Sequence, residues 1–105
     1  MAHNYDAQRR ETFDTFTNLP KGQTLPDMAV VDFLFFLEET DANWIAFQKA
    51  LRGKGFITKR DADYMIASFG PMKITAEAIW EREKLATELA LAYDFYPDGW
   101  DLGTD

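Results

Sequence analysis

The sequence predicts an α+β fold in which an antiparallel sheet of four strands carries two helices on one face, with an additional helix before them. Three observations lead to this prediction. A length of 105 residues is room for one domain. A composition of 47% hydrophobic and 15% aromatic residues supplies one substantial core. After residue 27, segments of alternating and of helical periodicity follow one another in the order β-α-β-β-α-β.

The N-terminal segment predicts a short amphipathic helix over residues 4–19. Pro20 and Gly22 end the pattern, and residues 21–27 form a connector. We therefore divide the chain into an N-terminal helix with its connector (1–25) and a ferredoxin-like domain (26–105). The helical spacing is carried by four side chains: Tyr5, Arg9, Phe13 and Phe16.

The first strand follows in the segment AVVDFLFFL. Its odd positions form a wholly apolar face, as expected of a strand that faces the core: Ala29, Val31, Phe33, Phe35 and Leu37. The even face is also mostly apolar, with Val30, Leu34 and Phe36. We expect residues 1–19 to be ordered and to cover this outer face of the sheet, either in the same subunit or in a second copy.

The middle of the chain predicts a helix and two strands. Residues 39–41 offer an N-cap, residues 44–51 have helical periodicity, and Gly53 or Gly55 ends the helix. Residues 56–58 and 64–69 predict strands joined by a turn at 60–63. Gly70-Pro71 indicates a bulge or a strand end, because proline cannot donate to a ladder.

The last third predicts a helix and a strand. Thr75 is an N-cap candidate, and the residues after it are rich in strong helix formers. The expected apolar stripe contains Ile79, Ala86, Leu89, Ala90 and Tyr93. A final strand is expected over residues 96–102. The complete order is that of the ferredoxin-like β-α-β-β-α-β sandwich, here with an additional N-terminal helix.

Charge is distributed unevenly along the chain. The net charge is −7, which argues against nonspecific nucleic-acid binding. From residue 75 onward there are eight acids and two bases. By contrast, five cations and no acid fall between residues 49 and 60: Lys49, Arg52, Lys54, Lys59 and Arg60. These cations complement the dipole at a helix C-terminus, or they form an anion- or RNA-binding edge.

The residue inventory excludes most catalytic and metal chemistry. The chain has no cysteine and one histidine, His3, so thiolate sites and histidine-based triads have no basis. A calcium loop built on Asp94, Asp98, Gly99 and Asp105 is disfavoured, because a proline occupies its fourth position. We expect no catalytic residue, no cofactor and no metal. No apolar run of membrane-spanning length and no signal-peptide core is present, so we expect a cytoplasmic protein that does not bind membranes.

The end of the chain carries a resemblance. The segment YDFYPDGW (Tyr93 to Trp100), preceded by EKLATELALA, resembles the close of the bacterial regulator of ribonuclease E activity B family, where a long helix leads into a strand with a Tyr-Asp-Gly-Trp signature. Pro97 is a one-residue departure. Pro26-Asp27, the helix at 44–51, Gly55-Phe56 and DYMIASFGPMKIT also match in position, so the resemblance covers residues 26–100.

The resemblance implies a ferredoxin-like fold and a function without catalysis. Members of the family bind ribonuclease E and inhibit it, and an acidic surface could compete for the arginine-rich segments of that nuclease. Trp100 and Tyr96 are either core anchors or part of a partner-facing patch. The candidate partner-binding residues are Glu77, Glu81, Glu88, Tyr96, Asp98, Trp100 and Asp101. Direct RNA binding by the cationic stretch is the alternative, and a hydrolase that uses paired carboxylates is a third hypothesis.

Overall fold

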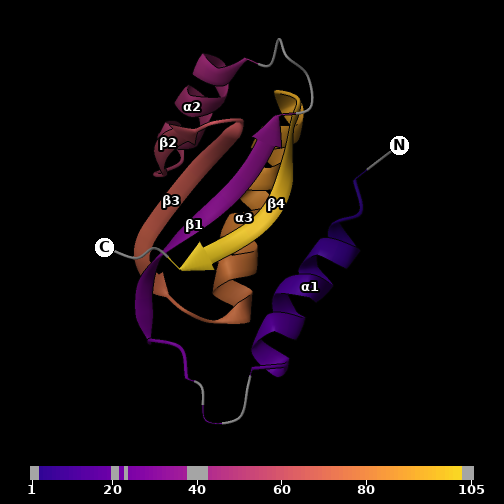
Figure 1. Ribbon diagram of the computed structural model, residues 1–105, viewed down its shortest axis with the longest axis vertical. Helices are drawn as coiled ribbons and strands as arrows, with labels where there is room; N and C mark the ends of the chain where they lie inside the picture. The colour runs from indigo at the N-terminus through magenta and orange to yellow at the C-terminus, as the bar shows by residue number, and fades with distance from the viewer. Residues whose placement is uncertain (1–2, 20–21, 23, 38–42, 103–105) are drawn as a thin grey trace.

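The predicted α+β class is confirmed: the computed structural model contains a four-stranded antiparallel sheet and three helices (Figure 1). It describes residues 3–19, 22, 24–37 and 43–102. In chain order, the elements of these residues are α1 (Tyr5–Thr17), β1 (Met28–Leu37), α2 (Trp44–Gly53), β2 (Ile57–Asp61), β3 (Tyr64–Lys73), α3 (Ala76–Ala92) and β4 (Phe95–Leu102).

Strand β1 lies at the centre of the sheet, whose order is β2-β3-β1-β4. It pairs with β3 on one side and with β4 on the other, and all three strand pairs are antiparallel. β3 continues past residue 69, where the sequence predicted its end, and the register shifts opposite Gly70. The bulge requires this glycine: its φ is +133°, and an added Cβ would lie 2.9 Å from the carbonyl oxygen of Ala29.

The core lies between the sheet and helices α2 and α3. The odd-numbered side chains of β1 face it as predicted, and Val31, Phe33 and Phe35 are almost completely buried. From the helices, Phe47 and Leu51 of α2 and Ile79, Ala86 and Ala90 of α3 complete the cluster. The rings of Phe35 and Phe47 pack edge to face at 5.6 Å, and burial of this face fixes the register of β1, because a one-residue slip would turn its apolar side chains away from the core.

Side-chain N-caps mark the start of the two core helices, α2 and α3. The side chain of Thr75 accepts a hydrogen bond from the backbone N–H of Ala78, as the sequence predicted. Helix α2 begins instead behind Asn43, whose side chain accepts from the backbone N–H of Ala46. The predicted cap at residues 39–41 lies outside the described residues.

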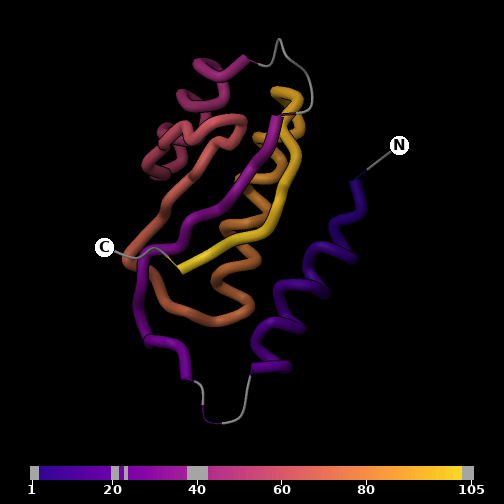
Figure 2. The backbone as a smooth tube through the Cα atoms, in the orientation of Figure 1, coloured from indigo at the N-terminus to yellow at the C-terminus, as the bar shows by residue number. Residues whose placement is uncertain are grey.

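Helix α1 does not cover the outer face of the sheet, so that prediction was wrong. The helix packs beside α3, on the same side of the sheet (Figure 2). Trp100 of β4 is paired with the buried Phe33 and therefore points toward the helices, where its ring stacks on Phe16 at a centroid distance of 6.0 Å. The polar residues that bury against α3 determine the position of α1, rather than the rings of Tyr5 and Phe13, which are only half-buried.

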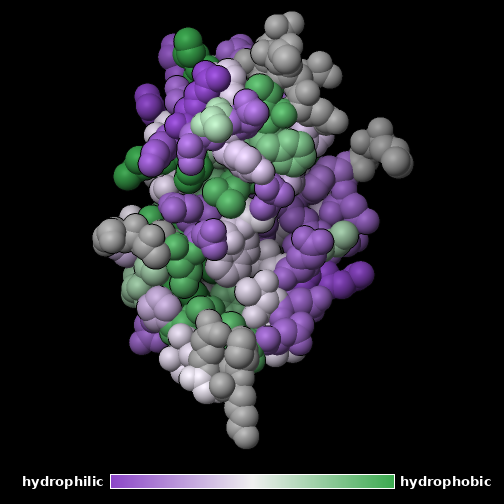
Figure 3. All heavy atoms as spheres, viewed as in Figure 1, coloured by the Kyte–Doolittle hydropathy of each residue, from purple (hydrophilic) through white to green (hydrophobic). Residues whose placement is uncertain are grey.

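The outer face of the sheet carries a mixed surface. In Figure 1 the sheet lies in front of α3, and the same view in Figure 3 shows hydrophobic residues interspersed with hydrophilic ones. Leu34, Phe36 and Ile66 are half-buried there, and Asp32 accepts a hydrogen bond from Ser68. Because it is mixed and partly polar, this face can remain in contact with water without α1.

Candidate functional site

The contact between α1 and α3 is polar, which is unusual for two packed helices. Gln8 and Thr12, one turn apart on α1, are 8% and 3% exposed. They face Glu83 and Thr87, which are 4% and 0% exposed on α3. Burial of a polar group costs free energy unless the group is hydrogen-bonded, so this contact between α1 and α3 depends on its hydrogen bonds.

A connected set of hydrogen bonds meets that requirement. The hydroxyl of Thr12 donates to Oε1 of Glu83 at 2.5 Å, and it accepts from Nε1 of Trp100 at 3.2 Å. The amide of Gln8 donates to Oε2 of Glu83 at 3.3 Å and to Oγ1 of Thr87 at 2.9 Å. Every buried side-chain nitrogen and oxygen among the described residues has a partner. The network therefore joins α1, α3 and β4 through one carboxylate.

The position of Glu83 raises the pKa of its carboxyl group. Burial raises its pKa above the ordinary value of 4.5, and the charge of Glu11 adds to the increase. Hydrogen bonds from Thr12 and Gln8, together with the charge of His3, lower the pKa in the opposite direction. Burial is the largest of these contributions, so the net effect of the site is to raise the pKa of the Glu83 carboxyl group.

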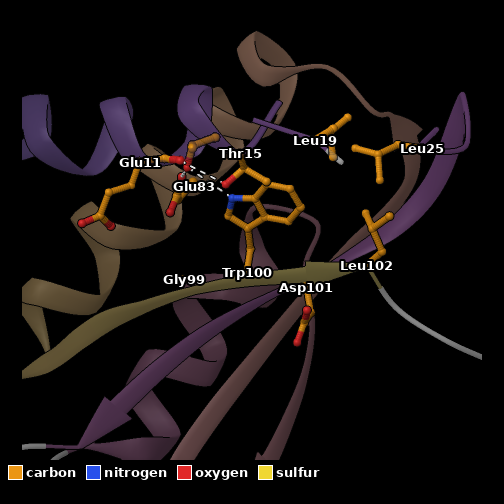
Figure 4. A pocket seen from close by; sticks show the side chains of 10 residues that line it. Glu11, Thr15, Leu19, Leu25, Glu83, Gly99, Trp100, Asp101 and Leu102 are labelled. Atoms are coloured by element: carbon orange, nitrogen blue, oxygen red, sulfur yellow. Dashed lines mark hydrogen bonds between the residues drawn. The ribbon is translucent and has the colours of Figure 1, made fainter. Parts of the chain in front are cut away.

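Two adjoining cavities form a groove between α1 and β4, which we call the α1–β4 groove; Figure 4 shows the side chains that line the larger cavity. They measure about 470 and 410 Å³, and both are lined by Glu11, Glu83 and Gly99. The larger cavity is lined in addition by Thr12, Thr15, Leu19, Leu25, Trp100, Asp101 and Leu102. The smaller one is completed by His3, Asn4, Ala7, Gln8, Pro97 and Asp98.

One wall of the groove is the main-chain edge of β4. All of residues 97–102 line it, although alternate side chains of a strand point to opposite faces. Figure 4 shows this alternation: the ring of Trp100 rises toward α1, whereas Asp101 points away. β4 is the last strand of the sheet, and within the described part of the chain only β1 pairs with it. The groove therefore follows a strand edge with one unpaired side.

The acidic residues proposed for partner binding do not form one cluster. Three are exposed on α3: Glu77, Glu81 and Glu88. Asp101 is paired with Asp32 on the outer face of the sheet. The carboxylate of Asp98 accepts a hydrogen bond from the hydroxyl of Tyr64 at 3.0 Å, and this bond raises the pKa of that hydroxyl. The acids are thus divided between α3 and the opposite side of the sheet.

Tyr96 and Trp100 lie on opposite sides of the sheet. The ring of Tyr96 packs against Phe36 on the outer face, with centroids 5.8 Å apart. Trp100 is half-buried, packs against the core and contacts both Phe16 and Thr12 of α1. Trp100 also lines the α1–β4 groove, so the same side chain packs against the core and contributes to the groove surface.

The cationic residues gather at the other edge of the sheet. All five (Lys49, Arg52, Lys54, Lys59 and Arg60) are exposed on α2, on β2 or between them. Two have defined contacts: Arg52 donates to Oγ1 of Thr58 at 3.0 Å, and the Arg60 guanidinium lies 4.1 Å from the ring centroid of Trp44. The α2–β2 edge is therefore basic, and β2 and β4 are the two outermost strands of the sheet.

Sequence patterns did not reveal the residues of the polar contact between α1 and α3. A signal for Glu83 was present, because it falls between Ile79 and Ala86 on the same helical spacing that predicted the buried stripe. A carboxylate at a core position requires donors on a neighbouring element. Gln8 and Thr12 carried no comparable signal, because a polar pair on a helix surface is most often solvated.

No protein-family model matches this chain, and no curated protein matches its sequence. Within the described residues, no group of three or more histidine, aspartate or glutamate side chains is arranged to hold a metal ion. Also within that part of the chain, no helix has the length and apolar character needed to cross a membrane. The inference of function therefore rests on the residues and their geometry.

Proposed function

We propose that this chain is a non-catalytic protein-binding regulator, similar to the inhibitors of ribonuclease E, which acts on RNA degradation through a protein partner in the cytoplasm. The resemblance from Pro26 to Trp100 supports the proposal. Within it, α3 leads directly into β4, and β4 contains Asp98, Gly99 and Trp100.

The observation that carries the proposal is the separation of charge across the sheet. Three exposed carboxylates (Glu77, Glu81 and Glu88) lie on α3 beside one exposed cation, Lys84, whereas five exposed cations gather on the α2–β2 edge. An acidic surface of this kind attracts cationic segments of a partner and speeds their association. Arginine-rich RNA-binding segments of a nuclease are such a partner, and covering them would reduce their access to RNA.

We also propose that the fold follows the ferredoxin-like plan with α1 as an addition. The strand order β2-β3-β1-β4 supports this assignment, as do the two β-α-β connections through α2 and α3. Fold alone assigns no function, so the binding test below is independent of it.

Binding of the intact chain to purified bacterial ribonuclease E tests the proposal. We expect binding at roughly 50 mM salt that weakens about tenfold or more at roughly 500 mM, because exposed charge pairs are screened. Replacement of the three α3 glutamates by glutamine (Glu77, Glu81 and Glu88) should weaken it further. A matched control replaces three exposed cations (Lys49, Arg52 and Lys54) by glutamine and should not reduce binding. No binding at low salt overturns the proposal.

The second candidate function is direct binding of RNA or another anion by the α2–β2 edge. The exposure of all five cations on this edge favours it. RNA affinity would then fall with added salt, with a slope near the number of phosphates contacted. Replacing Arg52, Lys54 and Arg60 by alanine would abolish it, and no detectable RNA binding at about 50 mM salt eliminates this candidate.

A homodimer formed on the outer face of the sheet is a further proposal about partners. The half-buried Leu34, Phe36 and Ile66 on that face support it. Sedimentation of the chain over a range of concentrations tests it: a Leu34→Lys substitution should shift a dimer toward monomer, and a monomer at all concentrations rejects the proposal.

A further inference from the structure

The α1–β4 groove has the shape of a site for an extended chain. Its two cavities adjoin end to end, because they share lining residues at Glu11, Glu83 and Gly99. One wall is helix α1, and the other is the Gly99 to Leu102 edge of β4, which pairs with no strand other than β1 in the described part of the chain. An extended peptide that enters beside a free strand edge satisfies its backbone groups by pairing with that edge. Pro97 lacks a backbone N–H, so such pairing is confined to the Gly99 to Leu102 end.

The chemistry of the lining changes along the groove. At its middle are the carboxylates of Glu11 and Glu83, and among the described lining residues only His3 can carry a positive charge. At one end the lining becomes apolar, with Leu19, Leu25 and Leu102 near the ring of Trp100 (Figure 4). The complementary occupant therefore has a cationic side chain and, further along, a large apolar one.

We propose that the α1–β4 groove binds an extended segment of a protein partner that carries an arginine or lysine near Glu11 and an aliphatic residue between Leu19 and Leu102. This inference deepens the proposed function, since it rests on the chain being a protein-binding regulator and names the surface and the partner chemistry. It does not rest on the partner being ribonuclease E. It also differs from the α3 acids, because Glu77 and Glu81 do not line the groove.

The spacing of the two partner side chains follows from the strand. Gly99, which both cavities share, and Leu102, at the apolar end, are three residues apart along β4. Three residues of extended chain span about 10 Å. Side chains of an extended chain alternate between two faces, so both partner side chains enter the groove only when they are an even number of positions apart. Two positions span only about 7 Å, so we expect a separation of four positions, and pairs that are adjacent in sequence should bind less well.

The test uses a capped seven-residue peptide with arginine at its second position and leucine at its sixth, threonine elsewhere, and a second peptide with the two exchanged. Amide chemical shifts of the isotope-labelled intact chain report where each peptide binds. We expect changes in α1 and at Gly99 to Leu102 for at least one of the two orders. Replacing the peptide's arginine by glutamate, or its leucine by serine, should remove the response.

Charge reversal on the protein supplies the matched control. Glu11→Arg should lower the affinity for the peptide about tenfold, because it places a like charge against the arginine. Asp14→Arg makes the same change in net charge at an exposed position of α1 that does not line the groove, and it should alter the affinity less than twofold. Glu11→Gln is the milder variant if Glu11→Arg disturbs the fold, with a loss of about threefold expected.

Several outcomes overturn the inference. These are no binding by either peptide at millimolar concentration, shift changes confined to the outer face or to the α2–β2 edge, and equal losses for Glu11→Arg and Asp14→Arg. The failures are distinguishable from those of the proposed function. Ribonuclease E binding that is insensitive to Glu11→Arg rejects the groove alone, whereas peptide binding without ribonuclease E binding rejects that partner alone.

Discussion

Removing the hydroxyl of Thr12 should weaken the docking of α1 more than any change of similar size elsewhere on that helix. Thr12→Val keeps the volume and the branched shape of the side chain, so it opens no cavity. It removes the donor to Oε1 of Glu83 and the acceptor for the indole N–H of Trp100. The perturbation therefore acts on two hydrogen bonds of one buried network.

The expected magnitude follows from these two bonds. A hydrogen bond to a charged group contributes about 1.5–3 kcal/mol, and a neutral one about 0.5–1.5 kcal/mol. Thr12 is 3% exposed, so water cannot readily replace the lost donor at the carboxylate. Trp100 is half-buried, and its indole N–H can recover part of its loss in water. We expect Thr12→Val to lower the free energy of unfolding by about 2–4 kcal/mol at pH 7.

Urea unfolding followed by circular dichroism measures this loss, and hydrogen exchange of the α1 amides shows whether the helix undocks before the rest unfolds. The matched control is Thr12→Ser, which keeps the hydroxyl and loses one methyl group, for about 1 kcal/mol. Equal losses of stability in the two variants, or a loss below about 0.5 kcal/mol in Thr12→Val, would contradict a structural role for these hydrogen bonds.

Three further predictions concern pH, the N-terminal helix and the bulge. Folding raises the pKa of Glu83, so between the unfolded pKa of about 4.5 and the raised pKa the folded state binds more protons than the unfolded state. The free energy of unfolding should therefore fall as pH rises through this range. Urea titrations at several pH values should find a smaller slope in Glu83→Gln, and an identical slope contradicts the prediction. Deleting residues 1–19 should lower stability and promote association, because it exposes Glu83, Thr87 and Trp100; a truncated chain with unchanged melting temperature and sedimentation speaks against the docked helix. Gly70→Ala should lower the free energy of unfolding by about 3 kcal/mol, because its Cβ would lie 2.7 Å from the Met72 nitrogen at a φ of +133°. Gly53→Ala is the control: an added Cβ there has no atom within 4 Å, so its thermal unfolding should be unchanged.

Local patterns in the sequence were sufficient to predict most of the sheet and its two core helices. The alternation in β1 identified the inward side chains, because a half-buried strand has a period of two. Thr75 identified the start of α3, because its hydroxyl meets a helix N–H that lacks a partner. The extent of β3 was underestimated because the Gly70-Pro71 bulge lets the strand continue past a residue that cannot donate.

The position of α1 could not be predicted from its own sequence. Its rings suggested that an apolar stripe would be buried, but they are used differently in the structure. The guanidinium of Arg9 lies 4.1 Å from the ring centroid of Phe13, and the ring of Phe16 stacks on Trp100. The buried side is polar because α3 presents Glu83 there, a long-range partner that no local periodicity reveals.

The candidate site was predictable only in part for the same reason. The sequence identified acidic and basic regions, and these lie on different parts of the fold as their separation in the chain suggested. The α1–β4 groove depends on two elements that are far apart in the chain, as the hydrogen bond from Trp100 of β4 to Thr12 of α1 shows. Its wall is a strand edge, and edges are set by strand order rather than by composition.

The most direct test of the proposed function is the rate at which purified ribonuclease E cleaves a defined RNA in the presence of increasing amounts of this chain. We expect the rate to fall with added chain in low salt and to recover when salt screens the acidic surface. The chain with its three α3 glutamates replaced by glutamine should inhibit less. A cleavage rate that is unchanged at a large molar excess of the chain in low salt would contradict the proposal that it regulates this nuclease.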